Sequence, residues 1–432
     1  MMVEQRYRLC VAFAAMLLSI FGASAQEDRA LGEELPRTRL IPYATATAAA
    51  ERGMAKQRYM QPIEAWSSEH EGVLTANFTY PFSWVERQLF MRVERVGCPY
   101  EVLVNGHVAG RSTNGFAAAE YNITKLCVED RNSVELRLLA NASVAAVECF
   151  AHEAETPRAY IIAQPRVRVR DVAWRTDMGH GGVVNLSFSV VMQNLTLGNK
   201  SSRLYYELYA NDTLRLGGGH RDVSLGMRGV DTMRFGAPVS DTLLWSAAAP
   251  QRLSLRLKNR VEGRDVEFYD IAVAPRELRY EDGRFYVNGE AVDVVWMELA
   301  PCSTVADVDA AVAAGATALR FGAGDVADEV LEYCDARGVY VAITAPINSS
   351  LSGTSRRRGG NPSNDPAWLD EYLLRTTQMI HTTKRHPSVI AYFLADDSEN
   401  GICLYESYLA AKAIAGDRPV MYSDGHGEWN SD

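Results

Sequence analysis

The chain has 432 residues, a length sufficient for about three domains, and its 47% hydrophobic and 23% charged residues are typical of a folded globular protein. Its formal net charge of −10 argues against nucleic acids and anionic membranes as partners, because both carry dense negative charge. After residue 25, no segment approaches the roughly 18 apolar residues of a membrane span, so we expect no membrane insertion.

Residues 1–25 are typical of an export signal. Two arginines precede an apolar run over residues 9–21, and Ala23-Ser24-Ala25 offers a small-residue cleavage site. We therefore predict a secreted or periplasmic protein whose mature chain starts after this segment. Residues 26–60 follow as a lead-in to the first domain, with one short helix expected around residues 45–58.

The cysteines and asparagines of the remaining chain bear on covalent modification. Six cysteines remain after the export signal, and their wide spacing matches no metal-binding motif. We expect mostly free thiols, with a Cys98–Cys127 or a Cys127–Cys149 disulfide as the alternatives. Eight Asn-x-Ser/Thr sequons matter only if the host glycosylates exported proteins, and they include Asn77, Asn122, Asn194, Asn211 and Asn348.

The next two segments contain strand patterns and no clear helices. Residues 61–155 show short alternating runs separated by turns, and Asn105-Gly106 between two such runs predicts a hairpin. Evenly spaced strands of this kind indicate a β-sandwich or a jelly roll. Residues 156–275 continue in alternating strands, which we interpret as a second all-β domain.

From residue 276 onward strands alternate with helical patterns, which is typical of a parallel sheet with crossover helices. The expected strands are 291–297, 317–321, 339–344, 389–394 and 420–423. The expected helices are 304–314, 325–337 (with Gly338 as its C-cap), 365–384 and 404–415. Residues 276–432 thus hold about five strands, and we predict an incomplete (β/α) barrel, because a whole one takes about 250 residues.

Three acidic residues directly follow the fourth expected strand. Residues 389–394 have the length and the β-branched or aromatic content of a strand buried on both faces, and Asp396, Asp397 and Glu399 come after it. A buried parallel strand that ends in carboxylates is where an α/β barrel enzyme carries its acid or base. The alternative is that these side chains cap the next helix, and the residues alone favour neither interpretation.

The sequence of this stretch resembles glycoside hydrolase family 2, the group of β-galactosidases, β-glucuronidases and β-mannosidases. The fourth barrel strand of that family reads H-P-S-x-x-x-W-S-L-G-N-E, and its last Glu is the general acid/base. Aligned from His386, this chain has Tyr392 for the Trp, Asp396 for the Asn and Asp397 for the catalytic Glu.

Other segments are similar to the same family. V-x-V-N-G at 102–106 and Y-N-I-T-K-L at 121–126 resemble its N-terminal jelly roll, and L-W-S at 244–246 with Pro250 resembles the end of its immunoglobulin-like domain. Residues 279–289 resemble the hairpin that precedes its catalytic barrel. The resemblance therefore implies a jelly roll, an immunoglobulin-like β-sandwich and a TIM-type barrel.

The resemblance also implies retaining hydrolysis of β-linked non-reducing-end sugars, with carbohydrate as the partner and without a cofactor or metal. It places Asp397 at the acid/base position and Arg320 and Asp396 at substrate-binding positions. Glu399 is a candidate substitute, because position i+2 lies on the same face of a strand. The family's acid at the end of strand three is Thr344 here, and its nucleophilic Glu on strand seven has no counterpart. We therefore expect weak or no activity.

Other interpretations stay open. The chain could be a non-catalytic carbohydrate-binding or structural module, or a gene fragment. Residues 356–358, three arginines, could meet an acidic sugar, although we favour a solvated loop. Asp424, His426 and Glu428 could form a metal corner, although a single His between glycines is more often part of a loop.

Overall fold

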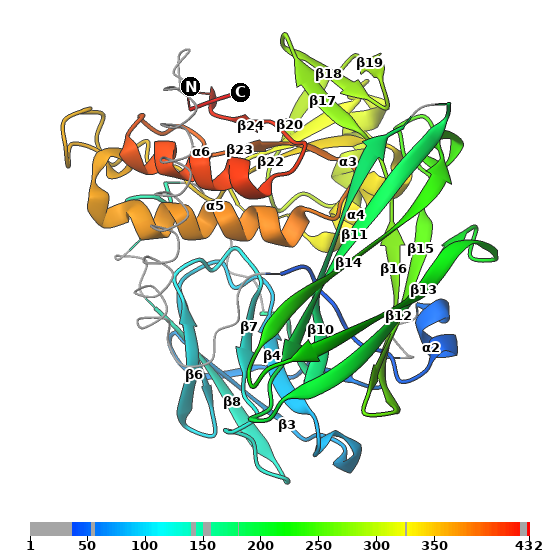
Figure 1. The fold of residues 1–432 in the computed structure, drawn as a ribbon. Helices are drawn as coiled ribbons and strands as arrows, with labels where there is room; N and C mark the ends of the chain where they lie inside the picture. Colours follow the sequence, from blue (N-terminus) through cyan, green and yellow to red (C-terminus); the bar gives the residue numbers. More distant parts are fainter. Residues whose placement is uncertain are drawn as a thin grey trace, which may run out of the picture.

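The computed structural model of the chain describes residues 37–52, 57–139, 144–149, 157–179, 181–324, 326–423 and 430–432. Two β-rich units and one unit of parallel strands with helices follow one another along these residues, so the molecule is mostly β (Figure 1). The predicted export signal and the proposed metal corner at 424–428 both lie outside the described residues.

The described part of the lead-in packs against both β-rich units. Tyr43 pairs with Phe268 of the second unit through backbone hydrogen bonds of 2.9 and 3.2 Å, and Arg37 is buried against Glu120 of the first. Helix α2 (Ala46–Glu51) starts where Thr45 caps it and ends at Arg52, whose φ of 51° is left-handed. The helix is therefore shorter than the predicted 45–58.

The first β-rich unit consists of two sheets that enclose one core. One sheet has the order β1-β9-β4-β7 and the other β2-β3-β8-β5-β6. Their strands are β1 Met60–Ile63, β2 Ser67–His70, β3 Val73–Phe78, β4 Gln88–Val93, β5 Tyr100–Val104, β6 His107–Ser112, β7 Ala119–Asn122, β8 Asn132–Leu138 and β9 Ala159–Gln164. The predicted hairpin is confirmed, because Asn105 and Gly106 join β5 to β6 with φ angles of 51° and 77°. The jelly-roll connectivity stays a prediction.

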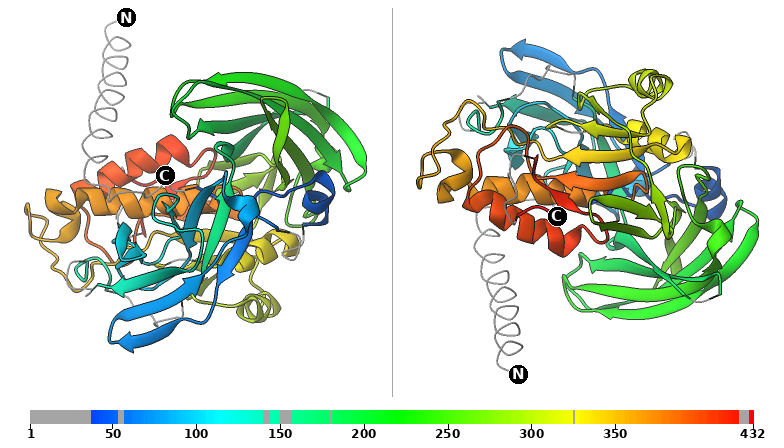
Figure 2. Two further views of the ribbon diagram at one scale, coloured as in Figure 1. Left: turned by 90° about the horizontal axis from the view of Figure 1, so that it is seen from below. Right: turned by 90° about the horizontal axis from the view of Figure 1, so that it is seen from above.

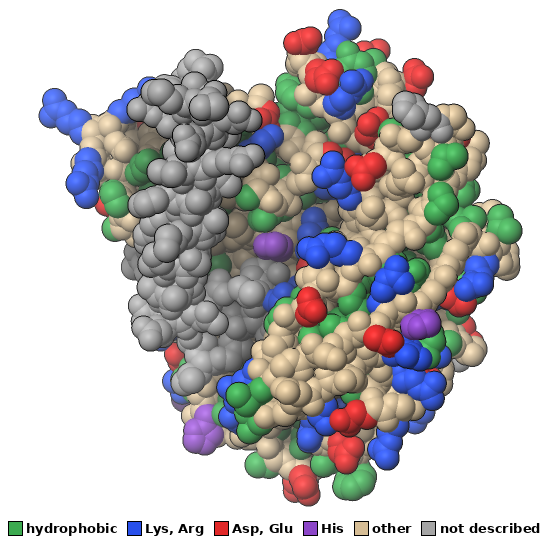
Figure 3. Space-filling model, in the orientation of Figure 1, with side chains coloured by type: hydrophobic (Ala, Val, Ile, Leu, Met, Phe, Trp, Pro, Cys, Tyr) green, Lys and Arg blue, Asp and Glu red, His purple; other side chains and the backbone are tan. Residues whose placement is uncertain are grey.

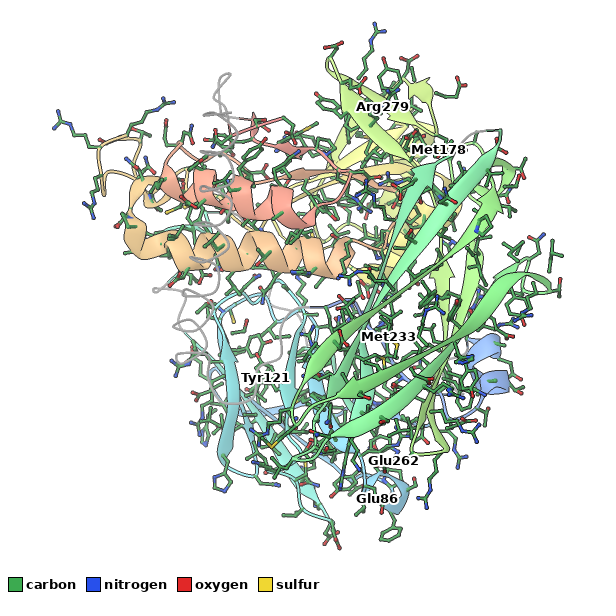
Figure 4. The ribbon with its side chains drawn as sticks, viewed as in Figure 1. Glu86, Tyr121, Met178, Met233, Glu262 and Arg279 are labelled. Carbon is green, nitrogen blue, oxygen red and sulfur yellow. The ribbon has the colours of Figure 1, made fainter. Side chains whose placement is uncertain are left out.

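The second β-rich unit is also built from two sheets around one core. The orders are β10-β11-β14 and β13-β12-β15-β16. The strands are β10 Val167–Met178, β11 Val183–Asn194, β12 Lys200–Ala210, β13 Leu214–Leu225, β14 Val230–Ser240, β15 Leu253–Val261 and β16 Arg264–Val273. Tyr121 and Met233, labelled in Figure 4, belong to the cores of the first and second units. The immunoglobulin-like classification stays a prediction.

The third unit begins with a small antiparallel sheet, β17 (Leu278–Glu281), β18 (Arg284–Val287) and β19 (Glu290–Val292). A five-stranded parallel sheet follows in the order of the chain: β20 Trp296–Leu299, β21 Ala318–Phe321, β22 Tyr340–Thr344, β23 Val389–Phe393 and β24 Val420–Met421. This confirms the five parallel strands expected from the alternation of patterns.

Helices α3 (Val305–Ala313), α4 (Asp328–Arg337), α5 (Leu369–Thr383) and α6 (Ile402–Ile414) connect the parallel strands. Helices α5 and α6 lie side by side along the sheet (Figure 2). Gly338 caps α4 with a φ of 74°, as predicted. Two 3-10 turns, η5 (Pro362–Asn364) and η6 (Pro366–Trp368), precede α5, so that helix starts later than the predicted residue 365.

The first predicted barrel strand, 291–297, is wrong in its bounds. Residues 290–292 pair antiparallel with β18, and the first parallel strand begins only at Trp296. The chain turns between them, where the Thr317 hydroxyl donates to the carbonyl oxygen of Asp293 and accepts from the amide of Val295. Because residues 291–297 form an apolar run that only Asp293 interrupts, their pattern alone cannot locate the break.

The His386-Pro387-Ser388 turn lies at the amino-terminal end of β23, away from the carboxyl edge of the sheet. The carboxylate of Asp335 in α4 contacts His386 Nδ1 at 2.7 Å and accepts from the amide and hydroxyl of Ser388 at 3.0 and 2.5 Å. The indole of Trp245, in the predicted L-W-S segment, donates to the Asp335 carbonyl oxygen at 2.9 Å. These two motifs therefore join α4, β23 and the second unit.

A buried polar joint fastens α5 to the first unit. The Arg375 guanidinium is fully buried and pairs with Glu148 at 2.6 Å, and it also donates to the Pro346 carbonyl oxygen at 2.7 Å. One turn further along the helix, Gln378 accepts from Asn114 at 2.7 Å. Buried pairs of this kind tolerate loss of one partner poorly, so the joint fixes how the parallel sheet sits on the first unit.

Candidate active site

The carboxyl ends of the parallel strands bring the predicted site residues together. Glu298 of β20 and Arg320 of β21 are partners in register, so their side chains share one face of the sheet, and Arg320 Nη1 donates to Glu298 at 3.0 Å. Asp396 lies just beyond β23 and contacts the same guanidinium. Arg320 and Asp396 therefore lie in one cluster at the edge where α/β barrels carry their sites.

Both carboxylate oxygens of Asp396 are already bonded within the protein. Arg320 Nη2 donates to one oxygen, and the backbone amide of Ala323 donates to the other at 2.7 Å. The guanidinium also lies 4.3 Å above the ring of Phe393, which holds it in place. Gly322 leaves room for this arrangement, because a Cβ there would lie only 3.3 Å from the carboxylate.

The pKa of Asp396 lies above its ordinary value. Burial raises it, and the nearby carboxylates of Asp397 and Glu298 add to this effect. The positive charge of Arg320 and the amide of Ala323 act in the opposite direction and do not cancel it. The charged form of Asp396 is therefore held mainly by Arg320, with the Ala323 amide second.

Asp397 occupies a strained position one residue further along. Its φ is 35°, in the left-handed region that residues other than glycine rarely adopt, and such strain is often found at functional sites. Asn348 Nδ2 lies 3.5 Å from its carboxylate, at the limit of a hydrogen bond. The Asn348 amide is oriented, because its oxygen accepts from the Ser350 amide at 3.0 Å and hydroxyl at 2.7 Å.

The first β-rich unit supports this corner of the site. The backbone amide of Asn348 donates to the carbonyl oxygen of Val147, and the backbone carbonyl oxygen of Asn348 accepts from the amide of Cys149, each at 2.9 Å. The amide of Asp396 donates to the neighbouring Ile347 at 2.9 Å. Short backbone bridges therefore join three segments side by side, 147–149, 347–348 and residue 396. The acids of the site are thus connected to a segment of the first β-rich unit.

The reasoning that placed Glu399 on the same strand face as Asp397 is wrong. Strand β23 ends at Phe393, so the period of two no longer applies to residues 396–399. Glu399 instead lies 3.7 Å from Arg356 in a pair whose side chains are 37% and 53% exposed. Arg356 is thus largely solvated, as we favoured for residues 356–358, although its acidic neighbour was not foreseen.

The alternative that the acids cap the following helix is also wrong. Helix α6 begins after Gly401, its N-cap, which has no capping side chain, and the amide of Gly401 donates to Asn400 Oδ1 at 2.8 Å rather than to one of the three acids.

Of the other family positions, Thr344 lies two residues after Ala342, the register partner of Arg320, and so shares the face of the sheet that carries Arg320, although it is fully buried. Tyr392 pairs with Ile343 and lies on the other face. The Thr344 hydroxyl donates to the Phe321 carbonyl oxygen at 2.8 Å, and Tyr392 is buried, its hydroxyl 3.3 Å from that of Thr383.

Two site residues were missed from the sequence, Glu298 and Asn348. The register of β20 against β21 would have identified Glu298, but the misplaced first strand hid it. Asn348 lies in a loop after β22, where no periodic signal exists. In the described part of the chain, no group of three or more His, Cys, Asp or Glu side chains could hold a metal ion.

Two further expectations concern cysteines and membranes. All six cysteines after the predicted export signal are free thiols, so the alternative disulfides are wrong. None of the helices in the described ranges is long and apolar enough to cross a membrane.

Comparison with known proteins agrees with this architecture. Residues 300–431 match the family model described as the TIM barrel domain of glycosyl hydrolases family 2. A β-galactosidase of Psychromonas ingrahamii is 23% identical over 382 residues, which cover 82% of this chain and 36% of that protein. A β-galactosidase of Vibrio vulnificus is 36% identical over 95 residues, or 22% of this chain and 9% of its own.

Solved structures share the fold. A β-glucuronidase of Bacteroides uniformis has a TM-score of 0.68 at 17% identity and covers 82% of this chain and 46% of its own. A glycosyl hydrolase family 2 member of Bacteroides cellulosilyticus has a TM-score of 0.66 at 14% identity, with 81% and 47% covered. These likenesses show the fold that the chain shares with these proteins, in which β-rich units precede parallel strands connected by helices. The match over residues 300–431 places this part of the chain in glycoside hydrolase family 2, and the whole chain spans about 36% of the first curated relative it matches.

Proposed function

We propose that the chain binds the non-reducing end of a β-linked sugar at the carboxyl edge of the parallel sheet and hydrolyses it weakly or not at all. In this proposal Asp397 occupies the acid/base position, Glu399 is its candidate substitute, and Arg320 and Asp396 contact the sugar. The β-galactosidases and β-glucuronidases among its relatives make β-galactosides and β-glucuronides the first substrates to test.

The observation that carries the proposal is the bonding of Asp396. A sugar hydroxyl must compete with Arg320 and the Ala323 amide for its carboxylate. Asp397 is one methylene shorter than the Glu of the family, and a displacement of about an ångström can cost roughly a hundredfold in rate. Retaining hydrolysis also needs a second carboxyl group about 5–5.5 Å across the sugar. These features weigh against efficient turnover.

The test is an assay of the purified chain on aryl β-galactoside, β-glucuronide and β-mannoside. We expect no product above a blank without protein. Clear hydrolysis that disappears in Asp397→Ala, while Arg175→Met stays active, would overturn the inactive state. Arg175→Met is the matched control because its side chain is 82% exposed on β10 of the second β-rich unit and pairs with Asp177, outside the candidate site.

Carbohydrate binding without catalysis is the second candidate, and the internal bonds of Asp396 favour it. A glycan array with the whole chain would report such binding. Binding that is unchanged in Asp397→Ala and Arg320→Ala would assign it to the β-rich units, whereas its loss in both variants would assign it to the edge of the sheet.

The proposal includes a domain division and a location. It takes residues 1–25 as an export signal, 26–60 as the lead-in, 61–155 and 156–275 as two β domains of jelly-roll and immunoglobulin-like type, and 276–432 as part of a barrel. It further takes the protein as secreted or periplasmic. N-terminal sequencing of the exported protein should begin at Gln26.

A further inference from the structure

The chain carries far more N-glycosylation sequons than chance would place in it. It has 17 asparagines, and eight are followed two residues later by Ser or Thr without an intervening Pro. Ser and Thr together make up only 48 of the 432 residues, so random placement would give about two sequons. Seven of the eight precede residue 276, in the β-rich units: Asn77, Asn122, Asn141, Asn185, Asn194, Asn199 and Asn211.

The structure separates these sequons into accessible and inaccessible ones. Four asparagines are exposed: Asn77 at the end of β3, Asn185 on β11, Asn199 just before β12, and Asn211 in the turn from β12 to β13. Asn141 lies outside the described residues, and Asn122 is half-buried. The four exposed side chains have the room that a branched oligosaccharide requires.

Two sequon asparagines are too deeply buried in the folded protein to carry a glycan. Asn194 is fully buried, and its amide group donates to the carbonyl oxygens of Gly198 and Gly226, each at 2.8 Å. Asn348 is 7% exposed and faces Asp397. A glycan on either nitrogen would replace these hydrogen bonds and could not fit, so both must stay unmodified in the folded protein.

A second observation points to three of these four positions. Large apolar side chains that are exposed to solvent lie beside three of them: Val183 (46% exposed) two residues before Asn185, Leu197 (72%) two before Asn199, and Leu214 (61%) three after Asn211. Figure 3 shows hydrophobic side chains among charged ones on the face of the molecule that is seen in Figure 1. A hydrophilic oligosaccharide beside such a side chain shields it from other molecules.

We infer that the protein is N-glycosylated at Asn77, Asn185, Asn199 and Asn211, and that the glycans cover the β-rich units while the carboxyl edge of the parallel sheet stays open. The donor is a lipid-linked oligosaccharide diphosphate. The asparagine nitrogen forms a bond to the anomeric carbon and loses a proton, and the bond from that carbon to the diphosphate oxygen breaks, so that the lipid diphosphate leaves with the electron pair.

The modification requires export, which is itself proposed above, and does not depend on catalytic activity. The first experiment takes the protein from its own cells and removes N-glycans with peptide N-glycosidase in water labelled with oxygen-18. Each occupied asparagine then becomes a labelled aspartate, which peptide mass spectrometry detects. We expect label at Asn77, Asn185, Asn199 and Asn211 and none at Asn194 and Asn348.

Each outcome decides the inference. Exported protein without label at the four exposed positions would overturn it and leave the proposed export intact. Protein that keeps residues 1–25 and stays inside the cell would overturn both. Label at Asn194 or Asn348 in folded protein would contradict the selection by burial. Hydrolysis of aryl glycosides is measured separately, so neither result depends on the proposed sugar site.

Variants of Ser201 supply the matched control, because they change the sequon and leave Asn199 in place. Ser201→Ala should lose the oligosaccharide at Asn199 and show one step of increased electrophoretic mobility. Ser201→Thr should keep the oligosaccharide at Asn199 and the electrophoretic mobility of the unchanged protein. Ser201 is exposed and pairs with Ser224 on the neighbouring strand, so neither change disturbs the core. Removal of all glycans should increase aggregation, since Val183, Leu197 and Leu214 lose their cover.

Discussion

At the scale of single residues, the charge of Arg320 controls the state of Asp396. Burial raises the pKa of this carboxyl group, and Arg320 opposes that effect. Arg320→Ala should therefore raise the pKa of Asp396 further, because the positive charge is lost while the burial and the neighbouring carboxylates remain. Carboxyl carbon-13 chemical shifts recorded against pH would measure the change.

The control for this prediction is a change of opposite sign at a neighbouring residue. Glu298 contributes negative charge to the same cluster, so Glu298→Gln should lower the pKa of Asp396. The effect should be smaller than that of Arg320→Ala, because the Glu298 side chain is 76% exposed and its field is screened by water. An unchanged titration of Asp396 in Arg320→Ala would contradict the assigned role of the guanidinium.

Single residues also show how far the sequence could predict the site. The family resemblance located Arg320 and Asp396 correctly at one edge of the sheet, since parallel strands carry their carboxyl ends together. It gave no information on the bonds of Asp396, because one partner is a backbone amide 73 residues away. Glu399 does not follow the alternation of β23, because the strand ends six residues before that position.

At the scale of elements, the His386-Pro387-Ser388 turn connects β23 to α4 through its hydrogen bonds with Asp335. Burial alone would lower the pKa of His386, but the Asp335 carboxylate outweighs burial, and the pKa lies above its ordinary value. A raised histidine pKa contributes stability that is fully present below the unfolded value of about 6.5 and is lost as the pH rises through the folded value. The free energy of unfolding should therefore fall as the pH rises above about 6.5 and through the raised folded pKa.

Asp335→Asn should remove most of this pH dependence and destabilise the protein at pH 6 by roughly 1–3 kcal/mol, because a buried charge-assisted hydrogen bond is lost. Urea unfolding at several pH values measures both effects. His381→Gln is the control, since burial lowers the pKa of His381 to about 4 and keeps it neutral throughout this range. An equal slope in the Asp335 variant and the unchanged protein would contradict the assignment.

The same elements explain which parts of the fold the sequence predicted. The order of strands and helices after residue 276 follows from local apolar periods, which belong to neighbouring residues and are visible in one chain. The partner of His386 is not visible in this way, since Asp335 lies 51 residues earlier on a different helix. The sequence therefore identified the turn as a family motif but did not indicate its contact with Asp335 of α4.

At the scale of the whole molecule, the three units are held together by polar pairs between distant residues. Arg375 and Glu148 are 227 positions apart, and their side chains are 0% and 1% exposed. The segment that contains Glu148 also bridges Asn348 beside Asp397. The position of the acids therefore depends on how the first unit docks against α5, and no pattern within either segment could predict this contact.

The joint gives a test of this dependence. Arg375→Met keeps most of the side-chain volume but leaves the Glu148 carboxylate buried without the guanidinium, which should cost roughly 3–5 kcal/mol of unfolding free energy. The double variant Arg375→Met, Glu148→Leu removes both charges of the fully buried pair and leaves only the Glu371 carboxylate, which also bonds Arg375 at 2.6 Å but is 14% exposed. It should recover more than half of that loss, because the more deeply buried carboxylate is gone. Arg356→Met, a change at a half-exposed arginine, should stay within about 0.5 kcal/mol of the unchanged protein. Urea midpoints measure all three, and a double variant no more stable than Arg375→Met would show that the carboxylate is not what makes the joint sensitive.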